Sequence, residues 1–216
     1  MVSVVMCSRD VSPPGGFEVH TPAPPRLCMH PPGDARRREV EAFIRRVYAE
    51  RYGADVSGFA PMLVSLQDDD DGIVAAAGYR SAAQDRLFLE GYFDQPIESL
   101  LKPHTEQPLS RTDIVEIGHL ASSRAGEGRR LVQMISAHLV EQGFDWVVCT
   151  LTAELRHLFL RIGITPLALG AADPDALGQD VGRWGSYYEH HPVVLASPLQ
   201  HVLHQMGRRR SSARLM

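Results

Sequence analysis

Residues 113–129 read DIVEIGHLASSRAGEGR, and this stretch carries most of the information about the fold. It begins as an apolar, β-prone run that is interrupted by Glu116 and His119. The run leads into a turn rich in Gly and Arg, and this turn opens an amphipathic helix. A strand that ends at a helix N-terminus is typical of phosphate-binding sites, because free backbone N–H groups and the helix dipole both favour an anion. Polar side chains in such a strand are candidates for chemistry beside the anion.

Composition limits the class of protein. The 216 residues are enough for one sizeable α/β domain with tails. The formal net charge of −4 argues against a general nucleic-acid binder, which would need a basic surface. The three cysteines show no paired spacing, so we predict neither a disulfide framework nor a zinc site and expect a cytoplasmic location. No apolar run approaches the ~20 residues that span a bilayer, and no secretory signal is recognised.

The two ends of the chain differ from its centre. Residues 1–33 are rich in Pro and Gly and are predicted to form a disordered or loosely attached tail. One folded domain is expected over residues 34–200. Residues 201–216 are predicted to be a C-terminal tail, whose basic segment 208–212 is interpreted as a solvated end.

The central region alternates between strand and helix signals. Helical spacing predicts a first helix from near Asp34 to Gly53 and later helices that end at Gly143 and Gly163. A short helix is expected from Asp94 to Leu101. Strands are predicted at Met62–Gln67, Ile73–Arg80, Arg86–Glu90, Asp113–Ala121, Phe144–Thr152, Thr165–Leu169 and Pro192–Ala196. This order predicts an α/β fold whose sheet is mixed and mostly antiparallel, with helices on both faces and a ligand where strands splay.

That order of elements resembles the acyl-CoA N-acyltransferase (GNAT) fold, in which the fourth strand carries catalytic groups and the next turn cradles the pyrophosphate of CoA. The turn motif of the family is Arg/Gln-x-x-Gly-x-Gly/Ala, and the nearest match here, Arg124–Arg129, is one residue shorter. The resemblance implies donor contacts from Leu120, Ala121, Arg124, Gly126, Gly128 and Arg129. Without it, the arginines are ordinary surface residues.

A closer resemblance covers roughly residues 37–198. The sequence is similar to the thermostable hemolysin family in the segments Val47–Ala54, Ala77–Arg80, Phe88–Glu98, Val115–Ala121 and Trp184–Glu189. That family usually carries Asn where this chain has His119. The family name records a cell-lysis phenotype and states no chemistry.

The chain also resembles the acyl-homoserine-lactone synthases, GNAT-like enzymes that take acyl chains from acyl-carrier protein or acyl-CoA. Those enzymes have an Arg on the strand matched by Ile73–Arg80, and Arg80 fits it. They also have a Glu, matched by Glu116, with an Arg three residues later, where this chain has His119. Recognition of S-adenosylmethionine is therefore not carried over.

Glu116 and His119 each allow two interpretations. A buried Glu116 has a raised pKa and suits a general base, but it can equally be a structural carboxylate paired with Arg80. His119 suits acid–base chemistry or a structural role. In a regular strand the two side chains point to opposite faces, so they share a site only if Gly118 marks a bulge.

Further candidates surround these residues. The connector residues Glu90, Tyr92, Asp94 and Glu98 either line a pocket for a cationic amine or serve as caps and solvated groups. The resemblance to GNAT enzymes implies a tyrosine late in the chain as general acid, which points to Tyr187 or Tyr188. Trp184 belongs either to the acceptor site or to an aromatic cluster at the sheet edge. The scattered histidines predict no metal site.

Together these features predict an acyltransferase that moves an acyl group from acyl-CoA or acyl-carrier protein to the amine of a small molecule. The acyl-phosphopantetheine thioester is the expected co-substrate, and neither nucleic acid nor stable membrane insertion is expected. Two alternatives are a membrane-active cytolysin and a catalytically inactive GNAT-like binding module. The absence of a long amphipathic segment argues against the cytolysin.

Overall fold

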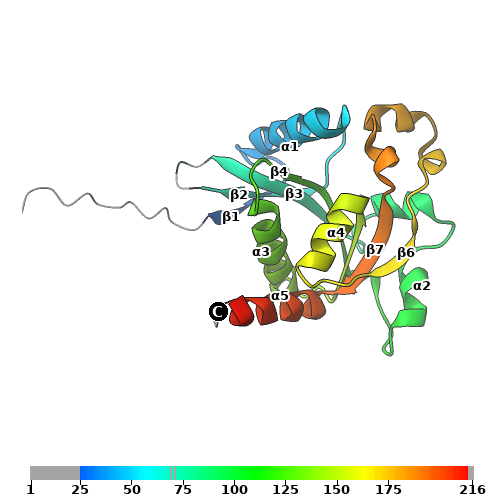
Figure 1. Ribbon diagram of the computed structural model, residues 1–216. Helices are drawn as coiled ribbons and strands as arrows, with labels where there is room; N and C mark the ends of the chain where they lie inside the picture. The colour runs from blue at the N-terminus through cyan, green and yellow to red at the C-terminus, as the bar shows by residue number, and fades with distance from the viewer. Residues whose placement is uncertain (1–24, 69, 71, 214–216) are drawn as a thin grey trace, which may run out of the picture.

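The computed structural model describes residues 25–68, 70 and 72–213, and its centre is one seven-stranded sheet (Figure 1). The strand order is β1-β2-β3-β4-β5-β7-β6, and only β4 and β5 pair in parallel. The prediction of a mixed, mostly antiparallel sheet is therefore confirmed. The strands are β1 Arg26–His30, β2 Met62–Gln67, β3 Ile73–Ser81, β4 Ile114–Ser122, β5 Trp146–Leu151, β6 Leu167–Ala171 and β7 Val193–Pro198.

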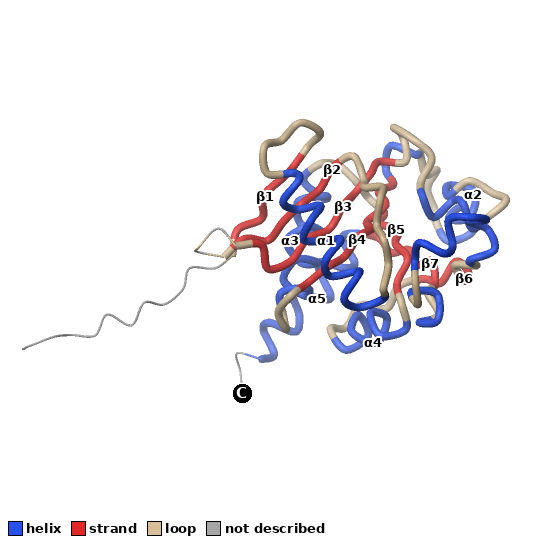
Figure 2. Tube along the Cα trace, turned by 90° about the horizontal axis from the view of Figure 1, so that it is seen from above, coloured by secondary structure: helices blue, strands red, loops and turns tan. Residues whose placement is uncertain are grey.

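Helices cover both faces of the sheet. Seen from above, α1 crosses one face, and α3 and α5 lie beyond the other (Figure 2). The α-helices are α1 Arg37–Tyr52, α2 Ile97–Leu101, α3 Glu127–Glu141, α4 Ala153–Arg161 and α5 Leu199–Ala213. Short 3-10 helices form η1 Phe88–Tyr92, η2 Lys102–His104, η3 Arg111–Asp113, η4 Pro174–Trp184 and η5 Tyr187–His190.

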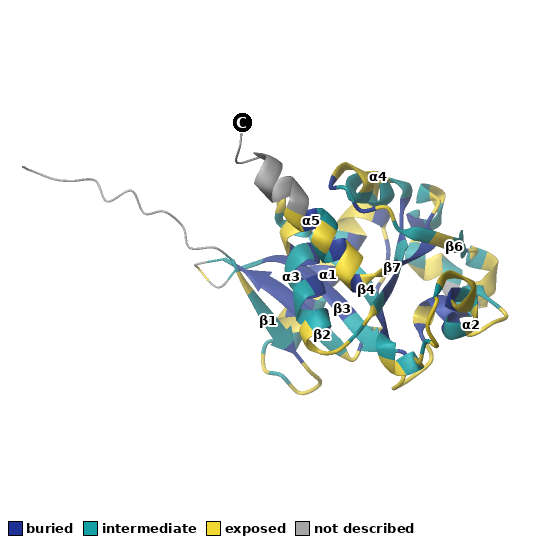
Figure 3. Ribbon diagram, turned by 90° about the horizontal axis from the view of Figure 1, so that it is seen from below, coloured by how far each residue is buried: buried dark blue, intermediate teal, exposed yellow. Residues whose placement is uncertain are grey.

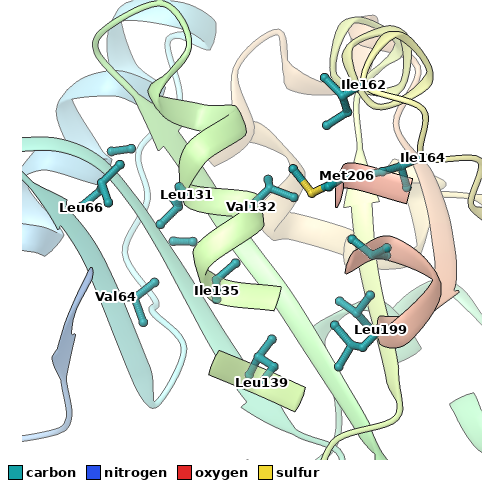
Figure 4. Packing of buried hydrophobic residues seen from close by; sticks show 14 of the residues in the cluster. Val64, Leu66, Leu131, Val132, Ile135, Leu139, Ile162, Ile164, Leu199 and Met206 are labelled. Carbon is teal, nitrogen blue, oxygen red and sulfur yellow. The ribbon is translucent and has the colours of Figure 1, made fainter. Parts of the chain in front are cut away.

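The largest part of the core lies between the sheet and α3. Leu131, Ile135 and Leu139 recur at helical spacing on α3, and all three are fully buried. They pack in one cluster with Val64 and Leu66 of β2, and α5 closes the cluster from the side (Figure 4). The apolar stripe of α3 is therefore used inside the protein.

The expected tails are shorter than the sequence suggested. Arg26–His30 is strand β1, which pairs along its whole length with β2. Residues 199–213 form helix α5, whose Val202 and Met206 are buried in one cluster with residues of α3 and the sheet. Figure 3 shows α5 beside α3. The prediction of tails at 1–33 and 201–216 is therefore wrong for residues 26–33 and 201–213. The remaining tail residues, 1–24 and 214–216, lie outside the described residues.

The strand predicted at Arg86–Glu90 is replaced by the 3-10 helix η1. The cause is Glu90, whose buried carboxylate accepts the N–H groups of Leu87 and Ile97 at 2.8 Å each. These bonds bend the chain around the carboxylate and exclude an extended strand. The residue pattern alone does not reveal this, because Leu87 and Leu89 also alternate as they would in a strand.

Two local features shape the centre of the sheet. Strands β4 and β5 pair only between Ile114–Ile117 and Trp146–Cys149, and beyond these residues they separate. In addition, β4 bulges against β3, because Gly118 pairs with Gly78 whereas Ala121 pairs with Ala76. His119 lies in this bulge with a φ of 54°, in the left-handed region.

Candidate active site

A cavity of about 370 Å³ opens where β4 and β5 separate. On the α1 side its wall is mostly aromatic, with Tyr48, Tyr52, Phe59, Phe88, Tyr92, Trp184 and Tyr187. On the other side its wall is aliphatic, with Val132, Ile135, Val147, Leu195 and Val202. Because α1 and α3 cover opposite faces, the cavity passes through the sheet. Its size lies in the range of small-molecule sites, roughly 300–1,000 Å³.

Glu116 lines this cavity from the centre of β4. Its carboxylate oxygens accept the backbone N–H groups of Phe88 at 2.8 Å and Leu89 at 3.0 Å, so η1 holds the side chain in place. The Nε of Arg80 lies 3.6 Å from one of these oxygens. Burial raises the pKa of Glu116 above its usual value, although both backbone bonds and Arg80 oppose the shift. A carboxylate with a raised pKa is suited to take a proton near neutral pH.

His119 lines the same cavity, because the β4 bulge turns its side chain to the side of Glu116. The condition set by the sequence, a bulge at Gly118, is therefore met. The ring packs on Phe59 with 5.3 Å between centroids, and Nδ1 is buried without a hydrogen-bond partner among the described residues. Burial and the charge of Arg80 lower its pKa to about 4, while a hydrogen bond to the backbone of Gly58 opposes this. The imidazole is neutral near pH 7 and links β4 to the loop after α1.

An aromatic cluster forms the roof of the cavity on the α1 side. Tyr187 stacks on Tyr48 and contacts Trp184, and its hydroxyl donates to the carbonyl oxygen of Thr150 at 3.5 Å. Thr150 follows the last β5 residue that pairs with β4, so this hydroxyl lies where the strands part. Tyr188 is outside the cavity wall, and its hydroxyl bonds to that of Tyr92 at 2.7 Å. Of the two candidate tyrosines, only Tyr187 reaches the cavity.

Three of the four connector candidates lie elsewhere. Glu90 and Glu98 both accept hydrogen bonds from Arg111 at 2.7 Å, and this pairing ties η1 and α2 to the segment before β4. Burial acts to raise the pKa of Glu90, but the bonds from Arg111 and two backbone amides outweigh it and lower the pKa. Asp94 is exposed and does not cap α2. Only Tyr92 lines the cavity.

The turn after β4 leads into the N-terminus of α3. Gly126 precedes the helix with a φ of 88°, a conformation that favours glycine. Arg124 is largely exposed, and its Nη1 donates to Asp68 of the β2–β3 hairpin at 2.9 Å. Arg129 is exposed on the first turn, and Gly128 packs beside Ser122. Leu120 lines the cavity, while Ala121 is buried toward α1.

Some cavity residues carry no recognisable signal in the sequence. Phe59, Phe88 and Tyr48 come from a loop and helices far apart in the chain, and Cys149 lies in an ordinary apolar strand. Burial raises the pKa of Cys149 to about 12, so the thiol stays protonated near neutral pH and is a poor nucleophile. Within the described residues, no three His, Cys, Asp or Glu side chains gather around a common metal position.

The comparison with known families agrees with this geometry. Residues 30–203 match the family model described as thermostable hemolysin. The chain belongs to the thermostable hemolysin family. A search of curated protein sequences finds no significant match.

Solved structures with the same architecture come from several acyl-transferring proteins. FeeM, an N-acyl amino acid synthase from uncultured soil microbes, matches with a TM-score of 0.56 over 84% of this chain and 94% of its own. The acyl-homoserine-lactone synthase LasI gives 0.54 over 83% and 95%, and the CoA-dependent synthase MesI gives 0.51 over 85% and 94%. Each is 14% identical to this chain. At this identity the likeness establishes a GNAT-like fold.

Proposed function

We propose that this protein is an N-acyltransferase that moves an acyl group from a phosphopantetheine thioester to the amine of a small molecule. The observation that carries this proposal is the cavity through the sheet at the β4–β5 separation, with Glu116 on its wall. A cavity with walls on both faces of the sheet gives donor and acceptor a common place to meet at the sheet. Holding two reactants in this way lowers the barrier by positioning.

The solved structures support the reaction class by their named activities. They include an N-acyl amino acid synthase and a CoA-dependent acyl-homoserine-lactone synthase, both of which form an amide from an activated acyl group. The shared fold is compatible with either acyl-CoA or acyl-carrier protein as the acyl donor of this chain. Either donor ends in the same phosphopantetheine arm.

In the proposed reaction, the amine nitrogen attacks the thioester carbonyl carbon. Glu116, directly or through a water, takes the proton that the nitrogen must lose. The C–N bond forms, the C–S bond breaks, and the thiolate leaves with the bonding electron pair and is protonated from solvent. A backbone N–H group near Leu120 polarises the carbonyl oxygen. The products are one amide and one free thiol.

Tyr187 has a different role in this scheme from the general acid that the resemblance implied. Burial raises its pKa well above the usual value, so it holds its proton more tightly than a thiol does. The hydroxyl therefore turns its single O–H from Thr150 to the departing sulfur and donates a hydrogen bond there without transferring its proton. Its position at Thr150, where the strands part, suits contact with the leaving group.

The donor has a natural place on the α3 side. The phosphates would lie at the turn and first helical turn, near Arg124, Gly126, Gly128 and Arg129, where helix amides and the dipole favour an anion. The acyl chain would enter the aliphatic branch of the cavity between α3, β5 and α5. Burial of each methylene there contributes about 0.8 kcal/mol, which favours a medium or long chain over acetyl.

A donor panel tests this function. Purified protein is incubated with acetyl-, hexanoyl-, decanoyl- and palmitoyl-CoA, and with the same acyl groups on acyl-carrier protein, together with a pool of small amines. Mass spectrometry of the products should reveal an amide whose acyl part follows the donor. Failure of every donor to yield an amide, with the folded protein verified by circular dichroism, would favour an inactive binding module.

A further inference from the structure

Arg80 on β3 is a cation on the cavity wall with unused hydrogen-bonding capacity. Its Nε lies 3.6 Å from Glu116, too far for a hydrogen bond, and its Nη1 reaches the carbonyl oxygen of Arg86 only at 3.4 Å. Its Nη2 has no acceptor among the described residues. The side chain is 21% exposed, so a partly buried guanidinium faces the cavity with donors to spare.

The other charged groups on the wall are already paired. Asp55 and Arg183 bind each other at 3.1 Å between Oδ2 and Nη2. Glu90, close enough to raise the pKa of Glu116, is held by Arg111 outside the cavity. The α1 side of the cavity, which faces away from the proposed donor site, therefore offers the acceptor one carboxylate, Glu116, and one neighbouring guanidinium, Arg80.

This arrangement is complementary to a zwitterion. In an α-amino acid one carbon separates the amine from the carboxylate, so the amine can face Glu116 while the carboxylate pairs with Arg80. Arginine suits this task, because its planar fork binds a carboxylate through two parallel N–H bonds. With a simple amine, the only anion within ion-pair distance of the guanidinium among the described residues is Glu116, and its Nη donors stay without a carboxylate. A polyamine meets no second unpaired carboxylate, since Asp55 is bound to Arg183, and Glu90 and Glu98 are bound to Arg111.

The walls around the pair specify the rest of the acceptor. Phe88 and Trp184 lie 5.8 Å apart between ring centroids, and Trp184 contacts Tyr187 at 5.3 Å, so the α1 side of the cavity is bounded by aromatic rings. Such walls suit an apolar or aromatic side chain better than a charged one.

We infer that the acceptor is a free α-amino acid with an apolar side chain, held through its carboxylate by Arg80. This inference rests on the proposed acyltransferase function and specifies its acceptor. The ammonium group first gives one proton to Glu116, which releases it to solvent, and the free amine then attacks the thioester carbonyl carbon. The C–N bond forms and the C–S bond breaks, and the second proton that the nitrogen loses is matched by the proton that the thiolate takes up. The products are an N-acyl amino acid, a free thiol and one proton in solvent. The carboxylate stays bound to Arg80 and does not react.

The test compares three acceptors that share the same ring and amine but differ at the carboxylate: L-phenylalanine, L-phenylalaninamide, in which it is a neutral amide, and phenethylamine, which lacks it. With the donor that the panel selects, the ratio of kcat/KM for phenylalanine to that for phenethylamine should be roughly 100 in the wild type, since a charged hydrogen-bonded pair is lost with the amine. Arg80→Met should bring this ratio close to 1, mainly through the KM for phenylalanine. Arg80→Lys should restore part of it.

Arg183→Met is the matched control, because Arg183 lines the same cavity but is already paired with Asp55. It should keep the high ratio. Calorimetry with L-phenylalanine in the presence of CoA adds a readout that needs no turnover, and Arg80→Met should abolish the binding isotherm.

Equal turnover of phenylalanine and phenethylamine in the wild type would overturn the inference while the acyltransferase function stands. A ratio that falls in Arg183→Met and persists in Arg80→Met would also overturn it. If no acceptor is acylated from any donor, the proposed function itself fails. Binding of L-phenylalanine that depends on Arg80 would, even then, support the amino-acid site.

Discussion

Glu116 is the residue on which the proposed chemistry depends most. Replacing it with Gln keeps the side-chain shape and one of the two backbone hydrogen bonds from η1 but removes the base, so turnover should fall by roughly two to four decades while donor affinity is kept. In the wild type, kcat should rise as the pH rises through the raised pKa of Glu116, because only the carboxylate accepts a proton. In Glu116→Gln, the plot of kcat against pH should no longer show this rise.

Glu106→Gln is a suitable control, because Glu106 is an exposed carboxylate outside the cavity. It should leave both kcat and the pH profile as they are. Full activity in Glu116→Gln would assign Glu116 a structural role, as a carboxylate that fixes η1 to the sheet.

His119 makes the stability of the fold depend on pH. Its pKa is lowered from 6.5 to about 4 in the folded protein, so between these values the unfolded chain binds a proton that the folded protein does not. Folding stability is therefore complete above about pH 6.5 and falls as the pH drops toward 4, by an amount on the order of 3 kcal/mol. His119→Asn, which has no titratable group, should remove this part of the pH dependence.

Urea unfolding at several pH values gives the free energy of unfolding of wild type and of His119→Asn. The difference between the two reports His119 alone, because the other titrating groups contribute equally to both. A difference that stays constant from pH 7 to pH 4 would contradict the buried neutral imidazole. The comparison needs no substrate and is independent of the proposed function.

Gly78 of β3 and Gly118 of β4 pair with each other, but the space around them differs, and this difference tests the bulge. A Cβ on Gly78 would lie 2.8 Å from Ala60 and 3.3 Å from the His119 Nδ1, whereas one on Gly118 meets nothing within 4 Å. Gly78→Ala should cost about 1–3 kcal/mol of stability through overpacking, and Gly118→Ala should be close to neutral. Equal thermal midpoints for the two variants would argue against the register described for the bulge.

The turn between β4 and α3 is the element that should hold the donor phosphates. The double variant Arg124→Ala/Arg129→Ala should weaken CoA binding in calorimetry at least tenfold, with little loss of stability, because exposed ion pairs such as Arg124–Asp68 contribute only about 0–1 kcal/mol. An acyl-pantetheine thioester, which lacks the diphosphate, should bind both proteins alike. A double variant with unchanged CoA affinity would place the phosphates elsewhere.

Most elements were predictable from periodicity, and those that were not have identifiable causes. Apolar residues at helical spacing predict the buried faces of α1 and α3. Continuous apolar segments likewise predict the buried strands β2, β3 and β5. Strand β1 is short and follows a Pro-rich segment, so its pairing with β2 is a tertiary effect. Helix α5 has few apolar residues, and only its packing on α3 reveals that Val202 and Met206 belong to the core.

The site was predictable only in part. Glu116, His119, Arg80 and Tyr187 were candidates on local sequence or resemblance, and all four line the cavity. The aromatic wall was predicted only at Tyr92, Trp184 and Tyr187. Its other members come from α1, the following loop and η1, and they are Tyr48, Tyr52, Phe59 and Phe88. The pairing of Arg111 with Glu90 and Glu98 is not visible in the sequence for the same reason, and it takes both carboxylates out of the predicted acceptor pocket.

At the scale of the whole molecule, the fold uses its apolar surfaces internally. The stripe of α3 is packed on the sheet, and among the described residues no helix has both the length and the hydropathy to cross a bilayer. If the proposed reaction yields a lipid-like amide with an apolar chain and a charged carboxylate, that product would have the amphiphilic character that membrane binding needs.

The most direct test of the central claim is to measure, in one reaction, the thiol released from an acyl-CoA or acyl-carrier-protein donor and the amide formed from an amino-acid acceptor. The account predicts that the two appear in a 1:1 ratio, that both need the acceptor, and that both nearly vanish in Glu116→Gln. Thiol release without amide, or release of dye from lipid vesicles by the purified protein with no donor and undiminished in Glu116→Gln, would contradict it.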